Sequence, residues 1–332
     1  MGAVTWVDEI EGRADALLPD YVAAYFRGSA GGGECLREGL AAWEDLRLRP
    51  SVLHDTSTLR TEVDVLGTRV RTPVLVAPMA QQVAAQPEGE VLTARAVVEH
   101  GSLLGLSTNT GVHFADVAAT GAPWWYQVYV MQDRSLTQRL VERAAAAGAR
   151  ALTLTVDTTA LAPALPGIEP TEWPDTYRKA RVVNLTPDVI AWLREISGLP
   201  VAVKGVLTAR DARRSVDAGA DAVIVSTHGG RRLGTSVTSA AALPEVVAEV
   251  GAEVEVHVDS GLRAGHHVVA ALALGARAVH IGRPVMWGLA SGGAEGVSAV
   301  LGRLHEELVT TLRQMGVGDV ADLRPADVAR KP

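Results

Sequence analysis

Residues 226–231 place a histidine and an arginine directly after an apolar run. Residues 222–225 read Ala-Val-Ile-Val and are followed by Ser-Thr-His-Gly-Gly-Arg, so that two glycines separate His228 from Arg231. A neutral imidazole accepts a proton and a guanidinium binds an anion, and glycines leave little bulk between the two. The segment therefore predicts a general base beside a fixed cation. On these residues alone, the alternative is a strand cap at His228 and a solvated charge at Arg231.

Eight short apolar runs, suited to buried strands, recur along the chain. They cover residues 74–77, 103–106, 124–128, 151–156, 201–203, 222–225, 254–258 and 278–281. Segments with helical spacing follow most of them, and several of these segments end in Gly-Ala, a usual glycine stop. Examples are residues 136–147, 209–218 and 264–274. This alternation predicts a closed parallel (β/α)8 barrel in a single α/β domain over residues 1–332. A doubly wound open sheet is the alternative.

Side chains at the carboxyl ends of the strands share one face of such a barrel and form its active site. The residues at these ends are Pro78, Met79, Ala80, Ser107, Gln127, Tyr129, Thr155, Asp157, Lys204, Ser226, His228, Asp259, Arg263, Gly282 and Arg283. The set combines a base, an acid, a lysine and arginines, which predicts a catalytic site. Glycines beside Arg263 and Arg283, Gly261 among them, predict a phosphate site, because backbone N–H groups and a helix N-terminus favour an anion.

The chain has 332 residues, a formal net charge of −7 and one cysteine, Cys35. The negative balance argues against nucleic acid or an anionic membrane as a partner. One cysteine forms no intrachain disulfide, and we expect no metal site, because no spacing of histidines and carboxylates is typical of one. Residues 1–19 lack the basic start and apolar block of a signal peptide, and no apolar stretch is long enough for a membrane span. The sequence therefore predicts a cytoplasmic protein.

Four of the remaining histidines fall in the last two strand and helix units. His257 and His280 lie inside predicted strands, and we expect them to be packed or hydrogen-bonded within the barrel. His266 and His267 open the helix after the seventh strand, and we expect them to be partly solvated.

Eight sequence motifs extend over nearly the whole chain. They occupy residues 77–80, 87–90, 127–129, 155–158, 203–206, 226–231, 259–263 and 271–284. Together they resemble the FMN-dependent 2-hydroxy acid oxidases and dehydrogenases, a family that includes glycolate oxidase, lactate oxidase and mandelate dehydrogenase. The resemblance implies that residues 1–70 form a helical extension packed on the barrel.

The resemblance also implies an FMN across the open end of the barrel. Its phosphate would lie at the corner of Arg263, Gly282 and Arg283, in agreement with the anion site expected above. The flavin ring would lie near Ala80, Ser107, Gln127, Thr155 and Lys204, and the ammonium of Lys204 would favour flavin reduction. The other expected cofactor contacts are Pro78, Met79, Ser226, Asp259 and Gly261.

In the family pattern, His228 is the catalytic base that accepts a proton from the substrate while reducing equivalents pass to the flavin. Asp157 would orient the imidazole and stabilise its charged form. Tyr129 would hydrogen-bond the reacting substrate atom. These three roles are implied by the resemblance.

The expected contacts to a substrate carboxylate depart from the family pattern. Arg231 would bind the carboxylate together with an N-terminal tyrosine, which is Tyr25 or, as the alternative, Tyr21. The family's second clamp arginine is replaced by Ala164. A small alanine side chain cannot supply a bidentate guanidinium contact. This half of the clamp is therefore missing.

Further substitutions lie on the substrate side. Residues 159–185 lie where the family carries a substrate-covering lid, and this stretch is short and rich in proline. Its cations are candidates to replace the lost arginine: Arg178, Lys179 and Arg181. Asn109 stands where glycolate-oxidising relatives carry an aromatic side chain in contact with the substrate. Thr227 replaces an asparagine, and the family's Arg-Gln-Leu followed by an acidic residue here reads Arg-Arg-Leu-Gly at 231–234.

We therefore expect an FMN-dependent oxidation of a larger or differently charged 2-hydroxy or 2-amino acid, as in a biosynthetic pathway. Dioxygen or another electron acceptor would reoxidise the flavin, and by resemblance the protein would form a homo-oligomer such as a tetramer. Two alternatives stay open at this point: a non-redox flavin barrel of the isomerase type, and a non-catalytic flavoprotein.

Overall fold

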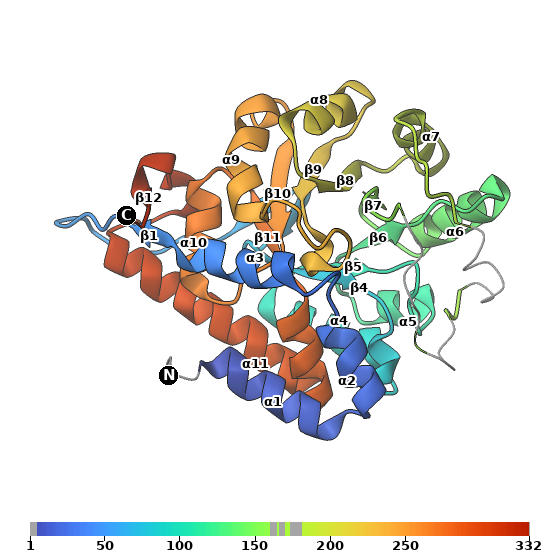
Figure 1. Ribbon diagram of the computed structural model, residues 1–332, viewed down its shortest axis with the longest axis horizontal. Helices are drawn as coiled ribbons and strands as arrows, with labels where there is room; N and C mark the ends of the chain where they lie inside the picture. The colour runs from blue at the N-terminus through green and yellow to red at the C-terminus, as the bar shows by residue number, and fades with distance from the viewer. Residues whose placement is uncertain (1–4, 160–164, 166–169, 173–180, 332) are drawn as a thin grey trace.

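A computed structural model describes residues 5–159, 165, 170–172 and 181–331. Within these residues, eight parallel strands close into one barrel (Figure 1). The strands are β4 (Val74–Met79), β5 (Leu104–Leu106), β6 (Trp124–Val128), β7 (Leu152–Thr155), β8 (Val201–Val206), β9 (Ala222–Val225), β10 (Glu255–Asp259) and β11 (Ala278–Ile281). Closure is complete because β11 pairs with β4, and β10 pairs with both β9 and β11. The predicted barrel is confirmed, and the open sheet is excluded.

In the described part of the chain, a helix follows each barrel strand. These helices are α4 (Gly89–His100), α5 (Phe114–Ala119), α6 (Arg134–Ala146), α7 (Asp188–Ser197), α8 (Ala209–Asp217), α9 (Ser239–Val250), α10 (Gly265–Ala273) and α11 (Arg283–Met315). Side-chain caps fix several starts: Asp133 accepts a hydrogen bond from the backbone N–H of Ser135, and Thr208 accepts one from that of Asp211. Such caps satisfy donors that the first helical turn leaves unpaired. Short 3-10 turns lie at η1 (Gln82–Ala84), η3 (His228–Gly230), η4 (Val320–Asp322) and η5 (Pro325–Asp327).

The N-terminal extension contains strands as well as the expected helices. Its helices are α1 (Trp6–Leu17), α2 (Asp20–Arg27) and α3 (Glu34–Glu44), and α1 lies along α11 (Figure 1). Strand β1 (Leu46–Leu48) pairs with β12 (Val328–Arg330) near the C-terminus. Strands β2 (Val63–Val65) and β3 (Thr68–Val70) form a hairpin, whose two turn residues Leu66 and Gly67 both have positive φ. That backbone matches the twist of a tight hairpin.

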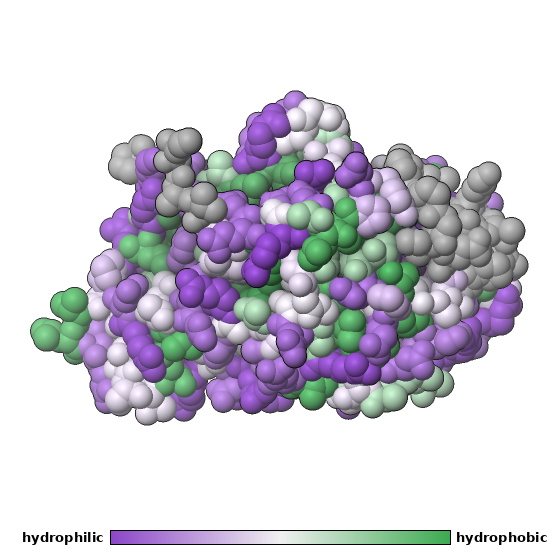
Figure 2. Space-filling model, turned by 90° about the horizontal axis from the view of Figure 1, so that it is seen from below, coloured by the Kyte–Doolittle hydropathy of each residue, from purple (hydrophilic) through white to green (hydrophobic). Residues whose placement is uncertain are grey.

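The surface combines polar residues with scattered apolar ones. Figure 2 shows small apolar patches between polar residues on one face of the molecule. Among the described helices, none is long and apolar enough to cross a membrane.

The barrel interior holds two buried histidines beside Trp125. Nδ1 of His257 lies 3.1 Å from Nε2 of His280, and Nε2 of His257 lies 3.0 Å from a carboxylate oxygen of Glu255. Burial, with His257 and Lys204 nearby, holds the pKa of His280 well below its usual value. Both histidines are packed and hydrogen-bonded, as the sequence predicts.

A buried carboxyl group fixes the loop after β5, which leads to the open end of the barrel. Glu90 on α4 is fully buried, and its Oε1 accepts a hydrogen bond from the backbone N–H of Gly111, at 3.3 Å. Its Oε2 has no hydrogen-bond partner among the described residues. Burial raises the pKa of Glu90 from 4.5 to about 7, although the backbone hydrogen bonds oppose this rise. The carboxyl group is therefore partly protonated near neutral pH.

A raised carboxyl pKa makes stability fall as pH rises from the unfolded value of 4.5 towards the folded value of about 7. We expect Glu90→Gln to remove this loss. The difference in the free energy of unfolding between variant and parent should then shift in favour of the variant by up to about 3 kcal/mol from pH 4 to pH 8. Urea unfolding of both proteins at the two pH values measures the difference. An identical pH dependence in parent and variant would contradict the assignment.

Candidate active site

A cavity of about 420 Å³ opens at the carboxyl ends of the barrel strands. Most of the sequence-predicted site residues line it: Tyr25, Pro78, Met79, Ala80, Ser107, Asn109, Gln127, Tyr129, Thr155, Lys204, His228, Arg231, Asp259, Gly261, Arg263, Gly282 and Arg283. They come from the extension and from every part of the barrel, and closure of the sheet brings them together. Asp157 and Ser226 are absent from the lining, and their positions are described below.

The backbone turn after β9 aims His228 into the cavity. His228 has a φ of 56°, an uncommon left-handed conformation for a residue with a side chain. Hydrogen bonds hold the turn: the backbone N–H of His228 donates to Oγ of Ser226 at 3.0 Å, and that of Gly229 donates to Oγ of Ser260 at 3.0 Å. Gly229 has a φ of 66°, a left-handed backbone that favours glycine, and a Cβ there would also lie 2.7 Å from a guanidinium nitrogen of Arg283.

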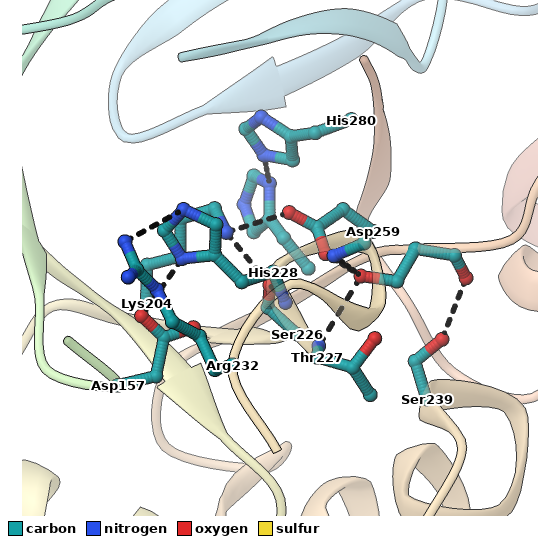
Figure 3. Close-up of polar contacts among 12 residues, drawn as sticks. Asp157, Lys204, Ser226, Thr227, His228, Arg232, Ser239, Asp259 and His280 are labelled. Atoms are coloured by element: carbon teal, nitrogen blue, oxygen red, sulfur yellow. Dashed lines mark hydrogen bonds and ion pairs between the residues drawn. The ribbon is translucent and has the colours of Figure 1, made fainter. Parts of the chain in front are cut away.

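Asp157 fixes the imidazole of His228 from the side (Figure 3). Nδ1 of His228 lies 2.9 Å from Oδ1 of Asp157, and so Nδ1 carries the proton that the carboxylate accepts. Burial would raise the pKa of Asp157, but His228, Lys204 and Arg232 lower it to about 2. Burial lowers the pKa of His228 despite the opposing effect of Asp157. At neutral pH the pair is therefore a neutral imidazole, with an unprotonated Nε2, beside a carboxylate.

A second buried pair lies at the ends of β8 and β10. Nζ of Lys204 lies 2.8 Å from Oδ2 of Asp259 and donates to Oγ of Ser226 at 2.6 Å. Burial disfavours the charged lysine, but Asp259 and Asp157 raise its pKa above the usual value. Ser226 is completely buried and holds Lys204 and the His228 turn. Ser226 does not line the cavity, and its predicted contact with a cofactor therefore has no support in this geometry.

Two half-buried arginines form the corner at which the sequence predicts a phosphate. Burial lowers the pKa of Arg263 to about 10 and that of Arg283 to about 9. No carboxylate of the described residues forms an ion pair with either one; Arg263 stacks on Trp287, and Arg283 donates to backbone carbonyls. Gly282 precedes the N-terminus of α11, which adds partial positive charge. A half-buried positive corner of this kind favours an anion.

Arg231 lies at the cavity edge and also caps α2. Its Nη1 donates to the backbone carbonyls of Tyr25, at 2.7 Å, and Gly28, at 3.1 Å, and its guanidinium lies 4.8 Å from the centre of the Tyr25 ring. Tyr25 lines the cavity, whereas Tyr21 is 55% exposed outside it. Of the two candidate tyrosines, Tyr25 is the one at the site.

Two more arginines line the cavity, Arg181 and Arg232. Arg181 donates to Oδ1 of Asn109 at 2.7 Å, and its guanidinium lies 4.2 Å from the centre of the Tyr129 ring. It is the one candidate replacement cation that can be placed. Arg178 and Lys179 lie outside the described residues, as do Ala164 and most of the predicted lid at 159–185. The predicted site omits Arg232, although the change from the family's Gln at this position is visible in the sequence.

Glu44, His266 and His267 form the one group of potential metal ligands found among the described residues. His267 is buried rather than partly solvated as predicted, because its Nδ1 accepts the backbone N–H of Arg263 at 3.1 Å. This hydrogen bond leaves the proton on Nε2, which lies 3.1 Å from Oε1 of Glu44. His267 therefore holds the Arg263 loop and presents no lone pair to a metal at Nε2.

The protein-family model described as FMN-dependent dehydrogenase matches residues 14–164 and 169–330 of the chain. The chain belongs to the FMN-dependent dehydrogenase family. The resemblance recognised in the motifs is thereby confirmed, and the protein is an FMN-dependent oxidoreductase of the 2-hydroxy acid oxidase type.

Similar proteins agree over the full length. An L-lactate oxidase from Nostoc sp. is 39% identical, with 95% of each chain covered. A 4-hydroxymandelate oxidase from Amycolatopsis orientalis is 36% identical, with 95% of this chain and 96% of the relative covered. A solved structure of a mandelate oxidase, with 3,3-difluoro-2-hydroxy-3-phenylpropionic acid, superposes with a TM-score of 0.93 at 35% identity, covering 98% of this chain and 99% of the other.

The cavity fits FMN on features of this chain. The positive corner of Arg263 and Arg283 suits a phosphate, and Nε2 of Gln127 is a buried donor without a partner among the described residues. An unpaired buried amide costs about 1–3 kcal/mol, which an acceptor on the flavin ring would offset. The Lys204 ammonium, also at the cavity wall, suits the electron-accepting end of a flavin.

We expect Arg263→Gln to weaken FMN binding by about tenfold to a hundredfold, because a charge-assisted contact to the phosphate is lost. Fluorescence titration of FMN into the apoprotein measures this. Arg210→Gln is the matched control, since the Arg210 side chain is 83% exposed and away from the cavity. Equal affinity in the Arg263 variant and the control would contradict a phosphate site at this corner.

Proposed function

We propose that the protein oxidises C2 of a 2-hydroxy acid, or of a related 2-substituted acid, with His228 as the base. The observation that carries the proposal is the Asp157–His228 pair, which leaves Nε2 of a neutral imidazole facing the cavity. Bound FMN would supply the acceptor for the hydrogen on C2 together with its electron pair, that is, for a hydride. Nε2 accepts the proton of the 2-hydroxyl group, and the product is the 2-keto acid.

The other cavity residues divide between orientation and charge. Tyr129 would hydrogen-bond the oxygen at C2, and Tyr25 and Arg231 would contact the carboxylate. Asp157 would orient the imidazole through its hydrogen bond to Nδ1, and its negative charge would stabilise the imidazolium that forms. Lys204 would stabilise negative charge that builds up on the cofactor side of the cavity. We also propose a larger or differently charged substrate than lactate or glycolate, because Asn109 and Arg181 occupy the substrate side.

The isomerase and scaffold alternatives do not require the His228 and Asp157 pair, and its intact geometry favours oxidation. We also propose that the enzyme is a cytoplasmic homo-oligomer with dioxygen or another electron acceptor and a biosynthetic role. The support is the resemblance to the family and the single, buried Cys35.

We expect His228→Ala to keep FMN but to lower the rate of flavin reduction by about a hundredfold to ten-thousandfold, since a positioned base contributes this much. Anaerobic flavin absorbance, after mixing with 2-hydroxy acids, 2-amino acids and their amides, measures the rate. His266→Ala, at a half-exposed side chain outside the cavity, is the control. Reduction of the His228 variant at the parent rate would exclude His228 as the base.

The base must be neutral to accept a proton, and its pKa lies below the ordinary value of 6.5. We therefore expect kcat/KM for flavin reduction to rise with pH through a limb below 6.5 and to be level above it. Initial rates between pH 4.5 and 8 test this. A limb well above the ordinary histidine pKa would show that the imidazole is instead stabilised in its charged form.

A further inference from the structure

A guanidinium rests against the proton-accepting atom of the base. Nη2 of Arg232 lies 3.4 Å from Nε2 of His228, and Arg232 lines the cavity (Figure 3). Its Nε is buried without a hydrogen-bond partner among the described residues. The family motif has glutamine at this position, so the cation is a feature of this chain.

The proton on Nδ1 of His228 points to Asp157, and Nε2 therefore has only a lone pair to offer. Arg232 donates an N–H into that lone pair. The base cannot accept a substrate proton there until the guanidinium moves away. A carboxylate is a better acceptor for a guanidinium than a neutral imidazole, because the hydrogen bond is then charge-assisted at both ends.

The positive charge of Arg232 is available to bind such an anion. No carboxylate among the described residues forms an ion pair with Arg232, and the nearby Asp157 is engaged by His228. Arg231 directs Nη1 to the carbonyls at the end of α2. Arg232 is therefore a cation beside the base whose charge the described residues do not neutralise by direct contact.

We infer that Arg232 binds the carboxylate of the substrate beside His228 and thereby uncovers Nε2. It supplies the second half of the carboxylate clamp from the loop after β9, in a chain that carries Ala164 at the family's usual position. The substrate is then an acid with a free carboxylate next to the reacting carbon. The corresponding amide or ester would not draw the Arg232 guanidinium away from Nε2 of His228. The inference rests on the proposed function for the identity of the reacting carbon.

The first test uses oxalate, a small dicarboxylate without a hydrogen to donate, and the FMN-loaded protein. Oxalate binding is followed by the change in flavin absorbance in the parent and in Arg232→Gln, Arg232→Lys and Arg181→Gln. We expect Arg232→Gln to weaken oxalate binding by about tenfold to a hundredfold and Arg232→Lys to weaken it less. Arg210→Gln is the exposed control and should bind oxalate like the parent.

Three results would overturn the inference: no oxalate binding to the parent at millimolar concentration, parent-like affinity in Arg232→Gln, or a loss confined to Arg181→Gln. If Arg232→Gln does not retain FMN, the lysine variant decides, because it keeps the charge but not the planar fork. Parent-like oxalate affinity in the lysine variant, together with parent-like preference for acid over amide, would then count against the inference.

The second test compares a 2-hydroxy acid with its amide. We expect the parent to prefer the acid and Arg232→Gln to lose most of this preference, chiefly through KM. The low-pH limb of kcat/KM should also move to higher pH, because Arg232 contributes to the lowered pKa of His228. An unchanged preference and limb would overturn the role of Arg232. Failure of every 2-hydroxy acid to reduce the flavin of the parent would instead reject the proposed function, and oxalate binding would still decide on Arg232.

Discussion

The hydrogen bond between Asp157 and His228 is the contact on which the site depends. The two residues follow strands β7 and β9, and β8 lies between them in the barrel. Gly205 in β8 makes the contact possible, since a Cβ there would lie 2.6 Å from the Cβ of Asp157. A φ of 107° at Gly205 also requires glycine. The tautomer of the base is thus set by the packing of three strands as well as by one carboxylate.

The cations that line the cavity fall into two groups, those at predicted cofactor contacts and those beside the expected substrate position. Lys204 is buried, Arg263 and Arg283 are half-buried, and all three line the cavity where the sequence predicts cofactor contacts. Arg181 and Arg232 also line the cavity, and the family motif has glutamine at the position of Arg232. The same electron acceptor combined with different anion contacts would let members of one family oxidise different acids with the same chemistry.

The sequence predicts the barrel well because buried parallel strands read as continuous apolar runs. Strands β6, β9 and β11 match their predicted residues 124–128, 222–225 and 278–281, and the other five differ by only a few residues at their ends. The ring of site residues follows, since the strand ends meet at one face. Contacts between side chains are harder to predict from the sequence. The burial of His267 depends on the Arg263 loop, and the burial of Ser226 depends on Lys204, a residue distant in sequence. The contact of the Arg232 guanidinium with His228 likewise depends on the backbone turn at His228.

The β2–β3 hairpin was missed for a different reason. Its strands are only three residues long, and Leu66, an apolar residue, occupies a left-handed turn position usually taken by glycine or asparagine. The sequence signal for a turn is correspondingly weak there.

The proposed role of His228 as the base depends on a neutral imidazole with its proton on Nδ1. Nitrogen-15 NMR of the histidine-labelled, FMN-loaded protein at pH 7, with His228→Asn to assign the signals, measures this state directly. We expect a protonated Nδ1 and an unprotonated Nε2 for His228. A proton on Nε2, or on both nitrogens, would contradict the assignment of His228 as the base.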